Sequence, residues 1–129
     1  MKKRPTPTPC PCGCPGTYEA CCGRLHRQEA VAADAQELMR SRYSAFVKKD
    51  VAYLLQTWHA STRPTELALD EPIRWVSLKI VSFEPGAKEA FVSFEARGKY
   101  NGRAFCQRER SRFLCELGRW YYLDGEVEE

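Results

Sequence analysis

The chain has 129 residues, of which 43% are hydrophobic and 29% charged, and its formal net charge is +3. This length fits one domain with a small appendage, and the balanced charge argues against a dedicated nucleic-acid binder. No apolar run approaches the roughly 18 residues of a membrane span. A proline-rich stretch, and no apolar segment, follows the basic residues at the start. We therefore expect a cytoplasmic protein with reduced thiols.

Five of the seven cysteines lie in the first stretch of interest, CPCGCPGTYEACC. Clustered cysteines in a reducing compartment usually bind a soft metal ion, and zinc prefers four tetrahedral thiolates. Cys10 and Cys12 form one close pair, and Cys21 and Cys22 form another beyond a turn. The alternatives are a free-thiol cluster, a disulfide knot or an iron–sulfur site. The spacing favours zinc.

The same residues resemble the SEC-C metal-binding motif, with Cys-Pro-Cys-Gly at 10–13, Tyr18 and Cys-Cys at 21–22. The resemblance implies a structural Zn²⁺ because four thiolates close the coordination sphere. It departs from the motif at Cys14, a fifth thiol that could compete as a ligand, and His26 is a second potential substitute. The implied ligands are Cys10, Cys12, Cys21 and Cys22. The basic residues expected to offset the charge of the site are Lys2, Lys3, Arg4, Arg24 and Arg27.

Two helices are predicted after the cysteine cluster. Residues 31–50 carry apolar side chains at helical spacing, and residues 51–59 form a shorter helix that the segment leading to Pro64 ends. Arg42 falls near the middle of the apolar face of the first helix. A buried arginine needs a partner, so this position singles out Arg42 as a candidate functional residue.

From residue 73 onwards the apolar pattern changes to a period of two, which predicts strands. Asn-Gly at 101–102 is a strong hairpin signal. The predicted strands are 73–83, which is bulged, 89–100, 103–117 and 120–123. Helices followed by an antiparallel meander predict an α+β layer fold.

Glu109 is a second charge on an apolar face, because it shares one side of its strand with Phe105, Phe113 and Leu117. We expect Glu109 and Arg42 to pair, or to line one polar cavity together. In the alternative interpretation each side chain reaches solvent at the end of its element, as long arginines can.

The sequence that follows the cysteine cluster is similar to the YchJ-like family of bacterial proteins, which has no established activity. The residues that carry the likeness are LMRSRYSAF at 38–46, TWH at 57–59, STRP at 61–64 and WYYLDG at 120–125. The resemblance implies an NTF2-like cone, in which helices pack on a curved antiparallel sheet, behind a zinc knuckle. We therefore expect a SEC-C motif at 1–28 and an NTF2-like domain at 29–129.

By analogy with such cones, we expect a pocket at the open end of the sheet. The candidate lining residues are Arg42, Tyr43, Trp58, His59, Trp75 and Glu109. The favoured function is a non-enzymatic zinc-binding adaptor, whose knuckle docks on a protein partner and whose cone is a scaffold or a small-ligand pocket.

Two alternatives have their own candidate residues. An enzyme of the acid–base isomerase or hydrolase type would use His59 and Glu109, with Arg42 as an anion clamp. A nucleic-acid-contacting protein would use the row Arg108, Arg110 and Arg112, although exposed strands often carry such charge to prevent aggregation. The sequence favours the non-enzymatic interpretation over both.

Overall fold

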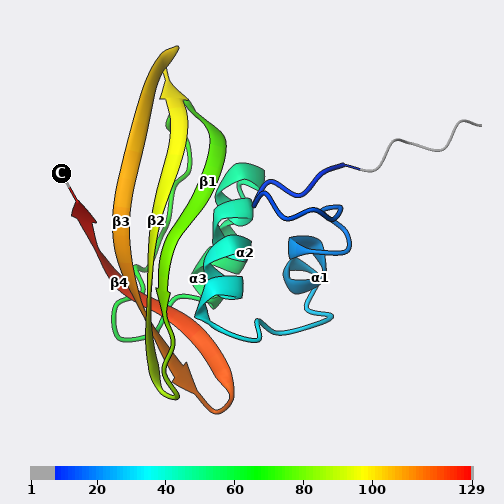
Figure 1. Cartoon of the computed structure of the whole chain (residues 1–129), viewed down its shortest axis with the longest axis vertical. Coiled ribbons are helices and arrows are strands. Elements are labelled where there is room, and N and C mark those ends of the chain that lie inside the picture. The colour runs from blue at the N-terminus through cyan, green and yellow to red at the C-terminus, as the bar shows by residue number, and fades with distance from the viewer. Residues whose placement is uncertain (1–7, 129) are drawn as a thin grey trace, which may run out of the picture.

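The computed structural model describes residues 8–128 as helices packed on one face of an antiparallel sheet (Figure 1). The sheet is a meander with the strand order β1-β2-β3-β4. Figure 1 shows α2 lying between the sheet and α1. The predicted α+β class is confirmed. The helices are α1 (Cys22–His26), α2 (Ala35–Lys48) and α3 (Val51–Gln56), and the strands are β1 (Ile73–Glu84), β2 (Glu89–Tyr100), β3 (Arg103–Glu116) and β4 (Arg119–Glu128).

Side-chain caps set the helix bounds. The Asp34 side chain accepts a hydrogen bond from the Glu37 amide, so α2 begins at Ala35 and not at the predicted residue 31. Lys49 takes a left-handed conformation with φ 57° and ends α2. Asp50 then caps α3 by accepting a hydrogen bond from the Tyr53 amide. The predicted division into two helices, with the boundary at residues 50 and 51, is therefore confirmed.

The second helix is shorter than its prediction of 51–59 and ends at Gln56. The chain leaves the helix there because its backbone pairs with β4. The Thr57 carbonyl accepts a hydrogen bond from the Tyr122 amide at 2.8 Å, and the His59 amide donates to the Tyr122 carbonyl at 2.7 Å. This pairing places Trp58 beside the inner face of the sheet, where its ring contacts Tyr122 edge-on.

The edge strand β1 agrees with its prediction, whereas the opposite edge strand β4 is longer than predicted. β1 contains two register shifts, which confirms the predicted bulged strand. β4 runs to Glu128, five residues beyond the predicted end at 123. Its acidic residues stand opposite arginines of β3, in the register Arg110–Glu126 and Arg112–Asp124. Opposite charges facing each other across the strands, of which Arg112 and Asp124 form an ion pair, thus favour a strand that has little apolar alternation.

The main core fills the space between α2 and the inner face of the sheet. Leu38 and Tyr43 of α2 pack there against Val92 and Phe113, all four almost fully buried. A smaller core joins Leu25 of α1 to α2 and α3. Residues 8–28 form a unit that we call the knuckle, and the remaining helices and the sheet form the cone. None of the helices in residues 8–128 combines the length and apolar character that a membrane crossing requires.

Candidate functional site

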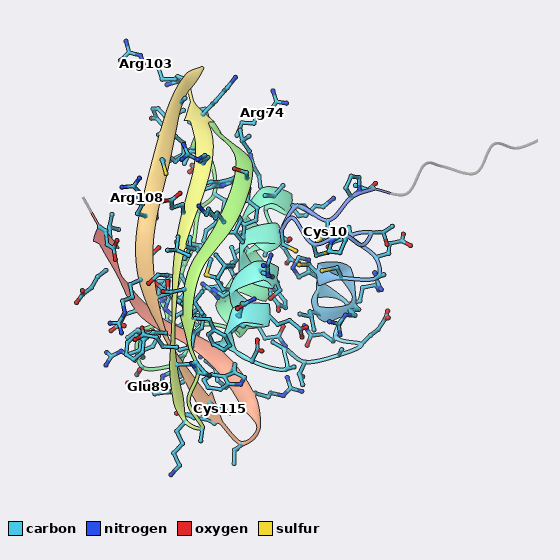
Figure 2. All side chains as sticks on the ribbon, viewed as in Figure 1. Cys10, Arg74, Glu89, Arg103, Arg108 and Cys115 are labelled. Atoms are coloured by element: carbon cyan, nitrogen blue, oxygen red, sulfur yellow. The ribbon has the colours of Figure 1, made fainter. Side chains whose placement is uncertain are left out.

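The four cysteines predicted as ligands lie together in the knuckle. The sulfur atoms of Cys10, Cys12, Cys21 and Cys22 are all within 4.8 Å of one another. The Sγ atoms of Cys12 and Cys21 are 3.7 Å apart, which is the separation of about 3.7 Å that tetrahedral thiolates take around zinc. Figure 2 shows Cys10 on the segment that faces α2. The geometry of this thiol group fits a metal ion.

Tight backbone turns bring the two cysteine pairs together. Gly13 takes φ 86°, a left-handed conformation that suits glycine, and its amide donates to the Cys10 carbonyl. The amide of Gly23 donates to the Tyr18 carbonyl at 2.7 Å. A Cβ at Gly23 would lie 2.7 Å from that same oxygen, so only glycine permits this close approach. The glycines of the CPCG and CCG segments are therefore required by the backbone turns, just as the cysteines are required as ligands.

The thiol group is buried and electrostatically coupled. Cys12 is fully buried, and Cys10 and Cys22 are nearly so. A hydrogen bond from the Cys22 thiol lowers the pKa of Cys12 to about 4, and the same bond, with burial, raises the pKa of Cys22. Neighbouring thiols thus favour the thiolate form of Cys12. A divalent ion would replace their protons, and four sulfur donors suit a soft or borderline ion.

Neither of the two substitute ligands joins this group. The Cys14 thiol is half-exposed and lies 3.8 Å from the Gly16 carbonyl. His26 uses both ring nitrogens elsewhere: its Nδ1 accepts from the Tyr18 hydroxyl at 2.6 Å, and its Nε2 donates to the Ser41 carbonyl of α2 at 2.8 Å. His26 therefore fastens the knuckle to the cone, a role that sequence reasoning missed.

Further contacts dock the knuckle on α2. Leu25 is buried in the small core, and Arg40 of α2 donates to the Cys12 carbonyl at 3.0 Å. Arg24 forms an ion pair with Glu37 of α2 at 3.0 Å. The knuckle and the cone are thus one packed unit. Arg27, also expected to offset the charge of the site, pairs with Glu29. Lys2, Lys3 and Arg4 lie outside the described residues.

A cavity of about 190 Å³ lies between α2 and the inner face of the sheet. It is lined by five of the six predicted residues, Arg42, Tyr43, Trp58, Trp75 and Glu109, but not by His59. Sequence reasoning missed the other lining residues, namely Met39, Phe46, Phe94, Ala96, Gln107, Ser111 and Tyr122. Gln107 and Ser111 could have been found, because they alternate with Glu109 on the same strand face. The cavity combines aromatic walls with a few polar groups.

Arg42 is the central charge of this cavity and is only 3% exposed. Its Nη1 donates to the Leu54 carbonyl at 2.8 Å and to the Thr57 hydroxyl at 2.7 Å. Its guanidinium lies over the rings of Trp58 and Tyr122, at 5.2 and 4.6 Å from their centroids. Burial lowers the pKa of Arg42 to about 10, so the side chain stays charged at neutral pH. Its side chain does not reach solvent, which excludes for Arg42 the alternative of a charge exposed at the end of its helix.

Glu109 shares the cavity with Arg42, and no ion pair joins the two within the described residues. Glu109 accepts weak hydrogen bonds from Gln107 Nε2 at 3.4 Å and from the Tyr122 hydroxyl at 3.5 Å. A Cβ at Gly125 would overlap its Oε1, so glycine on β4 makes room for the carboxyl group. Burial raises the pKa of Glu109. Of the two predicted arrangements, the structure has the shared cavity and not the direct pair.

The lack of a direct ion pair with Arg42 determines the expected effect of removing the Glu109 charge. A raised pKa means that folding favours the protonated carboxyl, so its contribution to stability is full below the unfolded pKa and is lost as the pH rises through the folded pKa. Glu109→Gln should therefore stabilise the chain slightly at pH 7 and leave its stability unchanged near pH 4. Urea unfolding at both pH values measures this. A clear destabilisation at pH 7 would mean that Arg42 depends on the carboxylate.

The acid–base pair of the enzyme alternative is not brought together. His59 lies outside the cavity, where its Nε2 meets Glu116 Oε1 at 2.5 Å and its Nδ1 meets the Ser61 hydroxyl at 2.7 Å. Its partners follow from the pairing of residues 57–59 with β4, which sets the ring against Tyr121 instead of Tyr122. Glu109 therefore has no histidine beside it in the cavity lining.

The arginine row of the nucleic-acid alternative is paired with acidic side chains on the outer face of the sheet. Figure 2 shows Arg108 pointing away from the helices. The ion pairs are Arg108–Glu95 at 3.1 Å, Arg110–Glu84 at 2.8 Å and Arg112–Asp124 at 2.7 Å. Carboxylates beside each guanidinium reduce the positive potential that phosphate binding needs.

Comparison with known proteins agrees with this architecture. The model of the YchJ middle NTF2-like domain matches residues 34–125. A UPF0225 protein of Streptomyces avermitilis is 50% identical over 129 residues, which cover 98% of this chain and 89% of that protein. A SEC-C motif containing protein from Rhodopseudomonas palustris superposes with a TM-score of 0.84 at 32% identity, over 93% of this chain and 98% of the other. A second one, from Psychrobacter arcticus, gives 0.76 at 26% identity, over 93% and 82%. The chain belongs to the YchJ-like family, whose relatives carry the UPF0225 name.

Proposed function

We propose that this chain is a non-enzymatic, zinc-dependent binding protein whose cone cavity receives a small organic ligand. Zn²⁺ on the four thiols would fold the knuckle into the shape that docks on the cone. The observation that carries the ligand-binding part is the cavity of about 190 Å³ with a buried guanidinium in its wall. Ligand sites are typically concave and mostly apolar, with a few placed polar groups, and this cavity has that composition.

Zinc is the proposed ion because the donors are four cysteine sulfurs gathered in one close group. A full set of protein ligands leaves no open position for a substrate, so the ion would be structural. The knuckle is too short to bury a core of its own, and metal binding would supply its folding free energy. The expected cytoplasmic location would keep the thiols reduced.

The cavity is large enough for one aromatic ring with small substituents. An apolar cavity of about 150 Å³ holds benzene in another protein, which is somewhat less than the volume found here. The rings of Trp58, Trp75 and Tyr122 offer flat faces on which a planar ligand can stack. These walls support binding, while the separation of His59 from Glu109 argues against acid–base catalysis.

Docking of the knuckle on an acidic protein partner, expected from the motif, is the lesser proposal. The observations that weigh against it are internal contacts. Three of the four cysteines are buried, and Arg24 and Arg27 are engaged with Glu37 and Glu29. The metal would then stabilise the fold of this chain instead of a contact with a partner. We therefore prefer small-ligand binding as the function.

The indole N–H signals of the three tryptophans test the proposal directly. In a proton–nitrogen NMR titration of the zinc-loaded chain with phenol, we expect the signals of Trp58 and Trp75 to shift with saturation. Trp120 does not line the cavity and should stay in place, as an internal control. If millimolar phenol leaves Trp58 and Trp75 unchanged, the cavity does not admit a ligand of this size and the proposed function is wrong.

A further inference from the structure

Two polar side chains of the cavity wall, Ser111 and Arg42, are placed to meet a ligand. Ser111 is 1% exposed, and its hydroxyl is buried without a hydrogen bond. The hydrogen bonds that Arg42 makes to described residues all come from Nη1, and its other guanidinium nitrogens are not fully buried unpaired atoms as the Ser111 hydroxyl is. A buried hydroxyl without a partner, as in Ser111, is rare because it forfeits its hydrogen bonds to water. Both side chains line the same cavity, which indicates groups held ready for a ligand.

The charge of Arg42 calls for an anion. Its present partners are a carbonyl, a hydroxyl and two aromatic faces, none of which carries a negative charge. Glu109 is the acidic residue of the lining, and it lies at the other end of Tyr122: the Arg42 guanidinium stacks on the ring of Tyr122, whereas Glu109 meets its hydroxyl. The cavity therefore has a cationic end and a separate acceptor end. A carboxylate is the natural partner of guanidinium donors.

We propose that the ligand is a single-ring aromatic carboxylate that bears a hydroxyl group, with its carboxylate toward Arg42 and its hydroxyl toward Ser111 and Glu109. This inference rests on the proposed function. The ring would stack between the aromatic walls of the cavity, and the cavity volume admits a single ring. The ligand hydroxyl would donate to the Glu109 carboxylate and accept from the Ser111 hydroxyl. It would thus give Ser111 the hydrogen bond that it lacks.

The placement of Ser111 and Glu109 supports one polar end. Both stand on the same face of β3, two residues apart, and Ser111 is paired across the sheet with Gly125, the glycine that makes room for the Glu109 carboxyl. A hydroxyl group between them would be within reach of both side chains. A ligand with a cationic group would instead place a like charge in a cavity that already holds the Arg42 guanidinium.

The test uses 3-hydroxybenzoate and 4-hydroxybenzoate as probes on the zinc-loaded full chain, read by the indole signals of Trp58 and Trp75. Benzoate lacks the hydroxyl, 4-hydroxybenzamide lacks the charge, and 4-hydroxybenzylamine reverses it. We expect the better hydroxybenzoate to bind about tenfold more tightly than benzoate and than the amide, as one well-made hydrogen bond or ion pair allows. The amine should not bind measurably.

Two variants and two matched controls sharpen the assignment. Ser111→Ala should not lower the melting temperature of the free chain, since the hydroxyl has no partner there, but it should remove most of the hydroxybenzoate advantage over benzoate. Arg42→Lys should remove the preference for carboxylate over amide. Ser77→Ala and Arg110→Lys change strand residues outside the cavity lining and should leave both preferences unchanged.

The outcomes separate this inference from the function on which it rests. Phenol binding without any preference for hydroxybenzoates would overturn the ligand class and leave small-ligand binding intact. Tighter binding of the amine than of the acid would also overturn it. If neither phenol nor any acid shifts Trp58 and Trp75, both proposals fail together. An unchanged hydroxybenzoate preference in Ser111→Ala would refute the assigned orientation.

Discussion

Cys12→Ser is expected to remove stoichiometric zinc from the chain and to lower its free energy of unfolding by about 2–3 kcal/mol, the value of one buried leucine. Cys12 is fully buried at the centre of the thiol group, 3.7 Å from the sulfur of Cys21. A serine hydroxyl is a poor zinc ligand, and three thiolates would leave an open coordination site. Without the ion, the short knuckle loses its main folding energy.

The loss should extend from the knuckle to the cone. Leu25 is buried against Ala45, Tyr53 and Leu54, and this contact exists only while the knuckle is docked. Exposure of Leu25 and of the facing surface of α2 and α3 accounts for the expected loss of stability. The cone keeps its own core between α2 and the sheet, so we expect a folded, less stable chain instead of an unfolded one.

Elemental analysis and denaturant unfolding measure the two effects separately. Cys14→Ser is the matched control, because Cys14 is a thiol of the same segment that lies outside the group of four. It should retain one zinc per chain and parental stability. One zinc per chain in Cys12→Ser, or loss of zinc in Cys14→Ser, would contradict the assigned ligand set. If zinc-free Cys12→Ser were as stable as the parent, the zinc-loaded knuckle would not stabilise the cone.

The sequence predicts the parts of this molecule that depend on neighbours along the chain. The two cysteine pairs and the strand 89–100 follow from local spacing and alternation, and both agree with the structure. His59 could not be placed in this way. Its partner Glu116 is 57 residues away, and the contact depends on Thr57 pairing with β4, which also shortens the preceding helix. The end of β4 likewise depends on arginines of another strand.

Arg42 and Glu109 illustrate a partial success. Charges on apolar faces predicted a direct pair or a shared cavity, because helix and strand periodicity determine which side of an element faces the core, and both side chains line one cavity. Periodicity carries no information on distance, and the aromatic side chain of Tyr122 lies between the two charges. A large cost of removing Glu109 would require a direct pair, and without that pair only a small pH-dependent effect is expected.

His26→Ala is expected to keep one zinc per chain while lowering the free energy of unfolding by about 2–4 kcal/mol, through lost buried hydrogen bonds and packing. The carbonyl of the fully buried Ser41 would lose the imidazole donor that it has beside its helical one, and the Tyr18 hydroxyl would lose its acceptor. The imidazole ring also packs on Tyr53, with 4.5 Å between the ring centroids. None of these contacts involves a metal ligand, so metal content and stability should separate.

The second histidine of the chain supplies the matched control. His59→Ala removes contacts with Glu116 and Ser61 near the surface and should change stability by less than about 1 kcal/mol. If His26→Ala also loses its zinc, His26 is a ligand or supports one. If its stability equals that of the parent, the knuckle is not fastened through this ring.

The double variant Cys12→Ser/His26→Ala decides whether the ion and the histidine act on one docking contact. Contacting parts of one network give non-additive changes, whereas independent sites add within about 0.5 kcal/mol. A knuckle already released by loss of zinc has no docked His26 to lose, so the second substitution should add little to the first. Full additivity of the two losses would mean that the zinc site and the His26 contact stabilise separate parts of the fold. Zinc would then stabilise the knuckle alone and not its contact with the cone.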